Sequence, residues 1–238
     1  MKPQNLQNYK AVILAGGKGT RLYPITKEIP KPLLPIGKKP IVNHLVDLFI
    51  AHGIKDIALL VSREFQEDFV WWNKRHYPNA KIELFAEQEP LGTFGGLWLV
   101  KDWLKDQRFF LTNGDELKEV NLEDMASFHE KSGGIGTLGL VQVENPQEYG
   151  VVVCDSDKVS EFLEKPKNPP SNFINSGLYL FSPEIFDYHK GPSFVMIEKD
   201  IFPALAKEGK LSGFKEVSRW TDCGTWERYE KALQEWGS

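Results

Sequence analysis

Cysteine is scarce in this chain of 238 residues, because only Cys154 and Cys223 are present and they have no metal-binding spacing. A cysteine zinc site is therefore excluded, and two thiols without a disulfide framework are typical of a reducing compartment. No apolar run in the sequence reaches about 18 residues, which excludes a membrane-spanning helix. The polar stretch from Met1 to Tyr9 has no apolar signal-peptide core, so we expect a short flexible lead over residues 1–9 and a cytoplasmic protein with no membrane partner.

An excess of positive charge is also missing. Lys and Arg number 29 against 33 Asp and Glu, which gives a formal net charge of -4. A general nucleic-acid binder needs a basic surface, so no nucleic-acid partner is expected, and functional cations must be concentrated in a local site. The five histidines form no metal-binding pair, and no Ser-His or Cys-His constellation predicts covalent catalysis. The chain does have 41% hydrophobic and 12% aromatic residues, enough for a packed core.

Apolar runs and amphipathic stretches alternate along the first part of the chain. The run from Ala11 to Ala15 indicates a buried parallel strand that ends at a glycine-rich loop. This alternation predicts an open α/β sheet with helices on both faces. Further strands are expected at 57–61, 81–85, 108–112 and 135–143, with helices at 40–52, 95–104 and 121–131.

The pattern changes after Asn145. Two alternating segments, 149–154 and 158–163, flank Asp155-Ser156-Asp157 and predict a hairpin. No internal repeat occurs, so no repeat architecture is expected. A further strand is expected at 173–181. One helix is expected to begin at Ser182, and two more are expected at 194–207 and 225–236.

A glycine-rich loop, Gly16 to Arg21, directly follows the first strand. Glycine lets backbone amides approach an anion, so the loop can cradle phosphate oxygens, although such a loop can also be only a turn. It is not a Walker A loop, because Gly19 follows Lys18. It is not a dinucleotide fingerprint either, because Leu22 stands where the third glycine is required, and this excludes a dinucleotide-dependent dehydrogenase.

Two cations follow the glycines. Arg21 closes the loop, and Lys31 lies between Pro30 and Pro32, which stiffen the segment and fix the approach of the lysine. A guanidinium and an ammonium placed in this way suit a triphosphate that loses pyrophosphate. The alternative is that both are solvated surface charges.

The chain resembles the sugar-1-phosphate nucleotidylyltransferase family in two strings, Gly16-Gly17-Lys18-Gly19-Thr20-Arg21-Leu22-Tyr23-Pro24 and Lys31-Pro32-Leu33-Leu34-Pro35. The resemblance extends over nearly the whole chain. It implies a three-layer αβα Rossmann-like nucleotidyltransferase fold, with a mixed central sheet and a small sugar-binding β subdomain. The implied single domain, 10–238, has a nucleotide-binding part at 10–143 and a sugar-phosphate-binding part with the C-terminal helices at 144–238.

The resemblance also implies an activity. A sugar-phosphate oxygen would attack the α-phosphorus of a nucleoside triphosphate in line, releasing pyrophosphate and a nucleotide sugar. Such chemistry needs positioning, cationic stabilisation and a metal ion rather than a covalent nucleophile. In the family the arginine and the lysine bind and polarise the triphosphate, so Arg21, Lys31 and Asp115 are the predicted catalytic residues.

Two aspartates are the predicted metal ligands. Asp115 follows the strand at 108–112 within Asn113-Gly114-Asp115, at the edge where α/β sheets bind ligands. Asp222 precedes the last helix within Trp220-Thr221-Asp222-Cys223-Gly224-Thr225. Each alone is more often a turn former or a helix N-cap. Both resemble the metal-binding aspartates of the family, and the implied cofactor is Mg2+.

A second set of residues resembles the sugar-phosphate site of the family. Glu164-Lys165-Pro166 matches a motif in which the lysine meets the sugar phosphate and the glutamate hydrogen-bonds sugar hydroxyls. Asn175 also matches a sugar-site position. Gly150 and Gly177 match as well and would let a sugar approach the backbone, although both can equally be ordinary strand glycines.

The segment from Glu87 to Thr93 is the predicted base-reading segment. Glu87 stands where thymidylyl- and uridylyltransferases of the family usually have glutamine, and a carboxylate can satisfy two adjacent N–H donors of guanine together. The string Glu-x-x-Pro-Leu-Gly-Thr is similar to that of guanylyltransferases for mannose 1-phosphate and favours GTP, although some relatives with this glutamate use other nucleotides. The residues implied to bind the nucleotide are Leu14, Ala15, Gly16, Gly17, Gly19, Thr20, Arg21, Lys31, Glu87, Pro90, Gly92, Thr93, Asn113 and Gly114.

Three alternatives stay open. A uridylyl- or thymidylyltransferase for glucose 1-phosphate would have to read the base with Gln88, and a GDP-heptose-forming enzyme would differ in its sugar. A nucleotide-sugar-binding regulatory subunit would be expected to have lost Arg21, Lys31, Asp115 or Asp222, and all four are present.

Three features have no functional assignment. Trp71-Trp72 indicates either core packing or a homodimer surface. Lys118 and Glu119 make the loop after the first metal-binding aspartate more charged than is usual in the family, and nothing in the sequence explains them. Cys223 stands where relatives commonly carry an aliphatic residue, and we expect it to be a packing residue.

Overall fold

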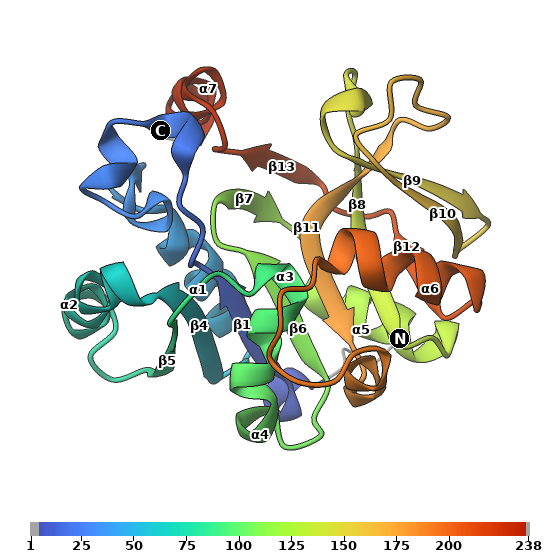
Figure 1. Ribbon diagram of the computed structural model, residues 1–238, viewed down its shortest axis with the longest axis horizontal. Coiled ribbons are helices and arrows are strands. Elements are labelled where there is room, and N and C mark those ends of the chain that lie inside the picture. The colour runs from blue at the N-terminus through green and yellow to red at the C-terminus, as the bar shows by residue number, and fades with distance from the viewer. Residues whose placement is uncertain (1–4, 237–238) are drawn as a thin grey trace.

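The apolar run at the start of the sequence forms a strand at the centre of the molecule. In the computed structural model, which describes residues 5–236, β1 (Lys10–Leu14) lies between two parallel neighbours, β4 (Asp56–Ser62) and β6 (Phe109–Asn113). β5 (Lys81–Glu87) extends this part of the sheet beyond β4, again in parallel (Figure 1). Because the four strands run in the same direction, their carboxyl ends meet at one edge of the sheet.

The other half of the sheet is mostly antiparallel. β11 pairs antiparallel with β6, which makes the sheet mixed, as the resemblance implies. β9 pairs with β10 and also back with β11 through Val151 and Ile174, so five strands close into a small ring. The five strands are β8 (Gly136–Gln142), β9 (Gly150–Asp155), β10 (Lys158–Glu164), β11 (Phe173–Phe181) and β12 (Leu211–Phe214).

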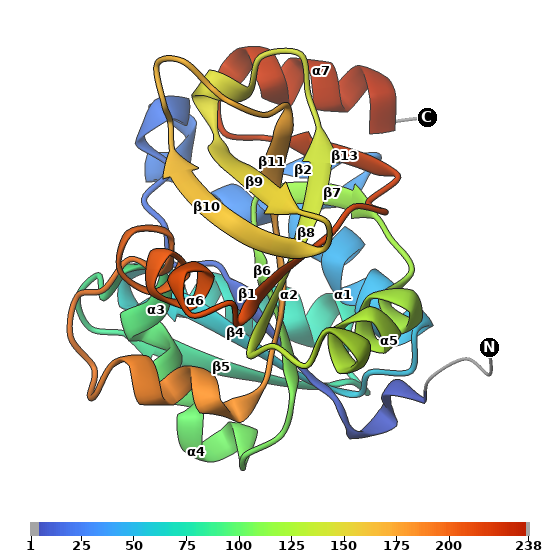
Figure 2. The ribbon, with the colours of Figure 1, turned by 90° about the vertical axis from the view of Figure 1, so that its right-hand side faces the viewer.

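Helices cover both faces of the sheet, as the sequence predicts, because the side chains of β1 alternate between two cores. Ala11 and Ile13 belong to one core cluster and Val12 to the other, and all three are buried. Figure 2 shows α3, α4 and α6 on one side of the strands and α1 and α5 on the other. The first cluster includes α1 (Ile41–Ala51), α2 (Gln66–His76) and α5 (Leu122–Ser132), and the second includes α3 (Gly92–Gly95), α4 (Lys101–Leu104) and α6 (Phe202–Lys207).

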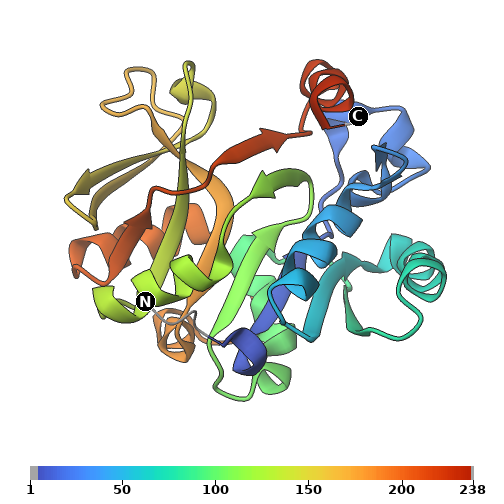
Figure 3. The same ribbon diagram turned by 180° about the vertical axis from the view of Figure 1, so that it is seen from behind.

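The C-terminal helix packs beside the segment that follows the phosphate loop. α7 (Trp226–Trp236) contributes Tyr229 and Ala232 to a third core cluster, which also contains Leu22. Figure 3 shows this red helix next to the blue N-terminal segment, seen from behind. Cys223 is buried in the same cluster, so its expected packing role is confirmed.

Two short ribbons lie outside the main sheet. One joins β2 (Pro35–Ile36) to β3 (Lys39–Pro40). The other joins β7 (Glu116–Glu119) to β13 (Arg219–Asp222) and places Asp222 opposite Glu116. The second ribbon therefore brings the C-terminal part of the chain to the end of β6.

The helix predicted over 194–207 is wrong at its beginning. The helical segment starts at Ile197 with a π-helical turn, Ile197–Ile201, that continues into α6. Val195 is not helical because its N–H donates to the Leu91 carbonyl oxygen at 2.9 Å and its own carbonyl oxygen accepts from the Phe94 N–H at 3.0 Å. This long-range contact brings the segment before α6 to the loop before α3, and no local pattern reveals it.

Other elements differ in extent from the predictions. The helix expected over 95–104 is divided into α3, a 3-10 turn (Gly96–Val100) and α4, and the helix expected from Ser182 is a 3-10 turn, Pro183–Tyr188. The sequence did not predict α2, β2, β3, β7, β12 or β13. A helix able to span a bilayer is absent from residues 5–236, since none of them combines sufficient length with sufficient hydropathy.

The predicted lead over residues 1–9 is only partly described. Residues 1–4 lie outside the described residues. Leu6 and Tyr9 are buried in the first core cluster, so the chain is packed against the domain before β1 begins.

The tryptophan pair divides between core and surface. Trp72 is buried and its Nε1 donates to Asn43 Oδ1 at 2.7 Å, so core packing is confirmed for this residue. Trp71 is 71% exposed, and the Lys74 ammonium lies over its ring. The homodimer stays a prediction.

A buried histidine connects α5 to the sheet. His129 Nδ1 lies 2.8 Å from Thr137 Oγ1 on β8, and its Nε2 lies 3.0 Å from Ser182 Oγ. In a neutral imidazole one nitrogen donates and the other accepts, and a hydroxyl can take either role, so the neutral ring satisfies both contacts. Burial lowers the pKa of His129 to about 4.

We predict that His129 makes the protein less stable in mild acid. The folded pKa is about 4 and the ordinary value is 6.5, so the unfolded state binds more protons between these values and stability falls as the pH drops. Lowering the pH from about 7 to about 5 should reduce the free energy of unfolding by roughly 2 kcal/mol through this group. Urea unfolding of the wild type and of His129→Gln at both pH values measures this loss. An equal pH dependence in the two proteins would contradict the prediction.

Candidate active site

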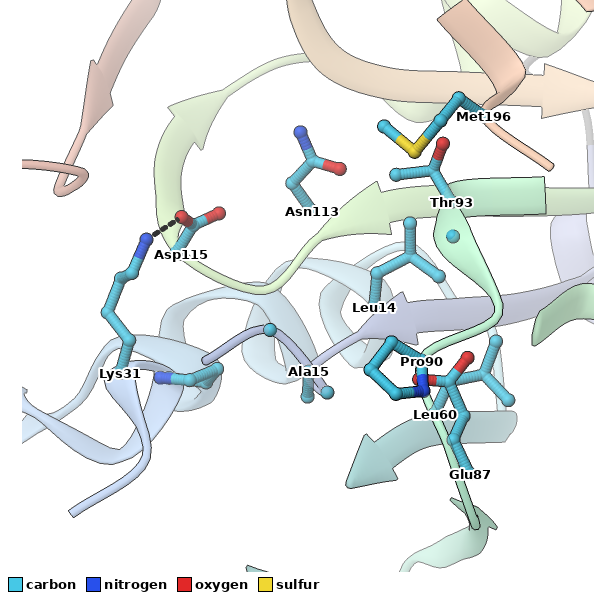
Figure 4. Close-up of a pocket in the computed structure, with 14 residues that line it drawn as sticks. Leu14, Ala15, Lys31, Leu60, Glu87, Pro90, Thr93, Asn113, Asp115 and Met196 are labelled. Atoms are coloured by element: carbon cyan, nitrogen blue, oxygen red, sulfur yellow. Dashed lines mark hydrogen bonds and ion pairs between the residues drawn. The ribbon is translucent and has the colours of Figure 1, made fainter. Parts of the chain in front are cut away.

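A cavity of about 260 Å³ opens at the carboxyl ends of β1 and β6, where the phosphate loop meets the predicted base-reading segment (Figure 4). Parallel α/β sheets present ligands at this edge. Asp115, a predicted metal ligand, also lines the cavity. The predicted nucleotide-binding residues that line it are Leu14, Ala15, Gly16, Gly17, Lys31, Glu87, Pro90, Gly92, Thr93 and Asn113.

The remaining predicted nucleotide-binding residues lie beside the cavity. The Gly114 N–H donates to the Leu14 carbonyl oxygen at 2.9 Å, which joins the ends of β6 and β1. Arg21 reaches toward the loop after β13, since a methyl group added at Gly224 would lie 3.1 Å from its Nη2. The others, which lead from the phosphate loop into a 3-10 turn, are Gly19 and Thr20.

An ion pair closes one side of the cavity. Lys31 Nζ donates to Asp115 Oδ2, and the Lys31 side chain is only 10% exposed. Burial is the largest single effect and disfavours the Asp115 carboxylate, but the charge and hydrogen bond of Lys31, together with the charge of Lys118, outweigh it and hold the pKa of Asp115 below its usual value. Figure 4 shows this pair on one side of the cavity and Glu87 with Leu60 on the other.

The second predicted metal ligand, Asp222, ends β13 next to the first. The Cys223 N–H donates to the Asp115 carbonyl oxygen at 3.0 Å, so backbone joins the two loops. Asp222 Oδ1 accepts from the Gly224 N–H at 2.7 Å, and its Oδ2 accepts from Arg228 Nη1 at 2.7 Å. The structure therefore brings together the two aspartates that the sequence separates widely.

The donor set around Asp115 and Asp222 fits magnesium. Mg2+ is usually held by one or two carboxylates, with water and phosphate oxygens completing its shell. Within the described residues no group of three or more His, Cys, Asp or Glu side chains is placed to hold a metal, which excludes an all-protein cage there. Two carboxylates on adjoining loops match the usual arrangement, in which one or two carboxylates hold the ion and water or phosphate oxygens complete its shell.

Arg228 is a site residue that the sequence did not predict. It lies on α7, and its guanidinium also donates to Glu148 and lies 4.7 Å from the centre of the Tyr149 ring. This places a cation from the last helix between Asp222 and the sugar-binding half. Arg228 lies six residues after Asp222 in the chain, and this proximity was the only feature of the sequence that could have connected the two.

Glu87 lies at the end of β5, between two glycines of other elements. Its Oε2 would lie 2.8 Å from a methyl group added at Gly16, and its Oε1 would lie 2.4 Å from one added at Gly96. Both neighbours must therefore be glycine for the carboxylate to occupy this position. Burial raises the pKa of Glu87, although a hydrogen bond from the Leu91 amide opposes the increase.

A second compartment of about 520 Å³ adjoins the cavity and shares Gly16, Gly17, Glu87 and Pro90 with it. Gln88, the alternative base-reading residue, lines only this second compartment. Glu87 lines both, so of these two residues Glu87 alone also faces the cavity that contains Lys31 and Asp115.

The predicted sugar-phosphate residues gather where β9, β10 and β11 meet, outside the cavity. Gly150 and Glu164 face each other in the β9–β10 pairing, and Lys165 follows with its N–H donating to the Tyr149 carbonyl oxygen at 3.0 Å. On β11, Asn175 Oδ1 accepts from the N–H of Gly177 at 2.9 Å. The pairing of β9 with β11 brings these strands together.

Three further residues escaped sequence reasoning. Leu60 and Met196 line the cavity, and Met196 arrives there through the long-range contact of the preceding segment. Glu198, in the π-helical turn, accepts from Thr93 Oγ1 at 2.7 Å, and burial raises the pKa of its carboxyl. No local motif marks any of them.

A buried polar network lies behind the loop that carries Asp115. Glu116 accepts from Asn113 Nδ2 at 2.8 Å and from Trp220 Nε1 at 2.9 Å. Lys118, which the sequence left unexplained, has a fully buried side chain and lies 3.2 Å from Glu116 Oε2. Glu119 instead lies at the surface, where it pairs with Arg219 at 3.2 Å.

Comparison with known proteins agrees with this arrangement. Residues 10–237 match the family described as Nucleotidyl transferase. The chain belongs to this family. Among solved structures, a putative glucose-1-phosphate thymidylyltransferase from Bacillus anthracis in complex with a sucrose superposes with a TM-score of 0.89 at 28% identity, covering 97% of this chain and 96% of that one.

A second similar solved structure is that of HddC from Yersinia pseudotuberculosis complexed with GMP-PN. It has a TM-score of 0.80 at 30% identity and covers 95% of this chain and 99% of its own. Among curated proteins, mannose-1-phosphate guanyltransferase beta-A of Xenopus laevis is 40% identical over 223 residues, which are 90% of this chain and 61% of that protein. The chain therefore spans about three fifths of the length of this curated relative.

A pair of glycine variants tests the packing of this nucleotidyl transferase site. Gly177 (φ 62°) and Gly133 (φ 61°) share a left-handed backbone, but a methyl group at Gly177 would lie 2.4 Å from Glu116 Oε2, whereas one at Gly133 would meet nothing within 4 Å. We expect Gly133→Ala to lower the free energy of unfolding by about 1–2 kcal/mol through backbone strain alone. Gly177→Ala should cost about 1–3 kcal/mol more, because it also collides with the buried network. If urea unfolding gave equal losses of unfolding free energy for the two variants, the buried network would accommodate the added methyl group at no cost in free energy.

Proposed function

We propose that this chain joins a nucleoside triphosphate to a sugar 1-phosphate, forming a nucleotide sugar and pyrophosphate, with GTP and mannose 1-phosphate as the preferred pair. The observation that carries the proposal is the meeting of the phosphate loop, Lys31 and two aspartates at one edge of the sheet. The identity of 40% with the Xenopus laevis protein supports the choice of substrates.

In this proposal an oxygen of the sugar phosphate attacks the α-phosphorus of the triphosphate. A new P–O bond forms while the bond from the α-phosphorus to the bridging oxygen of the β-phosphate breaks, and pyrophosphate leaves with the electron pair. Lys31 and Arg21 donate to the phosphates as negative charge develops on the leaving group. Asp115 and Asp222 would hold Mg2+, which would supply further positive charge to stabilise the leaving pyrophosphate.

The sugar phosphate is held by residues of the other half. Lys165 supplies the cation for its phosphate, and Glu164 and Asn175 hydrogen-bond its hydroxyls. Gly150 and Gly177 have no side chain to keep the ring away from the backbone. Since these residues lie where three strands of the ring meet, the acceptor would enter opposite the base-reading segment.

Guanine is the base that suits Glu87. A carboxylate only accepts hydrogen bonds, and guanine presents adjacent N1–H and N2–H donors that it can satisfy together. Uracil and thymine present one N–H between two carbonyl oxygens, one of which would face the carboxylate. The complex of the Yersinia pseudotuberculosis protein with GMP-PN, a guanine nucleotide, is consistent with this choice.

A thymidylyl- or uridylyltransferase for glucose 1-phosphate is the second candidate. The TM-score of 0.89 with the Bacillus anthracis protein favours it. It would require Gln88 to reach the base from the adjoining compartment. A GDP-heptose-forming enzyme differs only in the acceptor, and a regulatory subunit would bind nucleotide sugars without turnover. The cytoplasmic location and the homodimer belong to the proposal in each case.

Pyrophosphate release tests the proposed function directly. We expect GTP with mannose 1-phosphate and magnesium to be the fastest combination when GTP, UTP, dTTP, CTP and ATP are each paired with mannose, glucose and heptose 1-phosphates. If UTP or dTTP gave faster release than GTP, the proposed reaction would stand, but the argument that Glu87 selects guanine would be rejected. Binding of nucleotide sugars without release in any combination would favour the regulatory subunit.

Variants of the two aspartates test the metal site. Asp115→Asn and Asp222→Asn should each lower kcat by about a hundredfold or more, because each removes a charged ligand from the site of charge development. Asp155→Asn, at the exposed end of β9, is the matched control and should leave kcat unchanged. Turnover near that of the wild type in either site variant would remove that aspartate from the proposed metal site.

A further inference from the structure

A fully buried lysine lies between the two halves of the candidate site. Lys118 is on β7, beside β11 and paired with β13 (Figure 1). Its side chain is 0% exposed, and Nζ lies within hydrogen-bonding distance of four oxygens. The partners are Thr112 Oγ1 at 2.8 Å, Glu116 Oε2 at 3.2 Å, the Ser176 carbonyl oxygen at 2.9 Å and the Gly177 carbonyl oxygen at 3.2 Å.

The two carbonyl oxygens belong to a break in the sheet. The pairing of β11 with β8 stops at Asn175 and resumes at Tyr179, and its pairing with β6 begins only at Leu178. Ser176 and Gly177 therefore lie where β11 bends out of both ladders. Buried carbonyl oxygens need donors, and the Lys118 ammonium supplies them.

The same bend orients the predicted sugar-binding side chain. Asn175 accepts from the Gly177 N–H at 2.9 Å and donates to Tyr179 Oη at 2.8 Å, so its amide is fixed by the two ends of the bend. Trp220, which faces Lys118 in the β7–β13 pairing, also donates to the Ser176 carbonyl oxygen, at 3.1 Å. Both strands of the ribbon therefore supply donors to the bend.

The other end of the network reaches the nucleotide half. Glu116 accepts from Lys118 and from Asn113 Nδ2, and Asn113 lines the cavity. Glu116 also directly follows Asp115 in the chain. A charged hydrogen bond is stronger than a neutral one, so this pair is suited to fix the distance between the halves.

We propose that Lys118 is a positioning residue, which holds the sugar-binding bend of β11 (residues 175–177) against the metal-binding loop (residues 113–116). It does not touch the substrate, because its side chain is fully buried. Its role is to set where the sugar phosphate lies relative to the nucleotide. The inference rests on the proposed function for the identity of the two ligands.

A second buried lysine provides a matched control. Lys10 is also largely buried, at 8% exposure, and its Nζ donates to the Trp103 carbonyl oxygen. It begins β1, at the edge of the sheet opposite the cavity. Lys10→Met and Lys118→Met therefore remove the same ammonium group from two positions of low exposure, but only Lys118 lies at the site.

The test compares the two ligands in the two variants. Lys118→Met should raise the KM for the sugar phosphate about ten- to hundredfold, because small displacements of a reacting group have effects of that size. The Kd for the nucleoside triphosphate, measured by calorimetry, should change by less than about threefold, and Lys10→Met should leave both constants within about twofold. A sugar-phosphate KM in Lys118→Met equal to that of Lys10→Met would overturn the proposal.

A double variant separates positioning from stability. Lys118→Met leaves the Glu116 carboxylate buried without its cation, which destabilises the protein, and the additional change Glu116→Gln removes that charge. The double variant should regain stability in urea unfolding while the KM for the sugar phosphate stays high, since the bend still lacks its donor. If the stability and the KM for the sugar phosphate both returned to the wild-type values, Lys118 would only stabilise the fold, and the proposal would be rejected.

Trp220→Phe is the variant that tests the proposal if Lys118→Met does not fold. It removes the indole N–H that bonds Ser176 and Glu116, keeps an aromatic ring of smaller size, and should raise the same KM about threefold or more if donors to the bend position the sugar phosphate. An unchanged KM in this variant would count against the proposal.

Direct binding distinguishes failure of this inference from failure of the proposed function. If the wild type releases no pyrophosphate from any substrate pair, the proposed function fails. The Kd for GDP-mannose, measured by calorimetry, still decides the role of Lys118. Weaker binding in Lys118→Met than in Lys10→Met supports positioning, and equal binding rejects it.

Discussion

The ion pair between Lys31 and Asp115 joins segments that are 84 residues apart, and the geometry of the candidate site depends on it. The partners meet because β1 and β6 are neighbours and the Gly114 N–H bonds the end of one strand to the end of the other. Both side chains are largely withdrawn from water. Removing one partner of a fully buried pair costs about 3–5 kcal/mol, because the other is left as an uncompensated charge. The pair therefore fixes the approach of the Pro-Lys-Pro segment to the cavity.

The same rule extends to the other acids around the proposed metal-binding loop. Asp222 is paired with Arg228, and Glu116 is paired with Lys118, at 2.7 Å and 3.2 Å. A triphosphate carries several negative charges, and unpaired carboxylates at this edge would repel it. With each acid matched by a cation, the chain can be acidic overall, with a net charge of -4, and still offer an anion a place beside its phosphate loop.

Local patterns were sufficient for the elements that carry the glycine-rich loop and the proposed metal ligands. The apolar runs predicted β1, β4 and β6 to within a residue or two, because a strand buried on both faces has a composition that few other structures share. The motifs identified Asp115 and Asp222, and the structure brings them together. Met196, Arg228 and the contacts of Lys118 could not be predicted, because each depends on a partner that no local pattern reveals. The error at 194–207 has the same origin, since Val195 bonds across the chain instead of along a helix.

The β7–β13 ribbon explains how one element can serve both halves. Side chains two residues apart on a strand point to the same face. Glu116 and Lys118 are so related on β7, and their partners in register on β13 are Asp222 and Trp220. Two residues along the ribbon thus separate the proposed metal-binding aspartates from the donors that hold the bend of β11. A shift of one residue in this pairing would turn Asp222 and Trp220 to the opposite face of the ribbon. The positions of side chains in the nucleotide half and in the sugar half therefore depend on the same strand register.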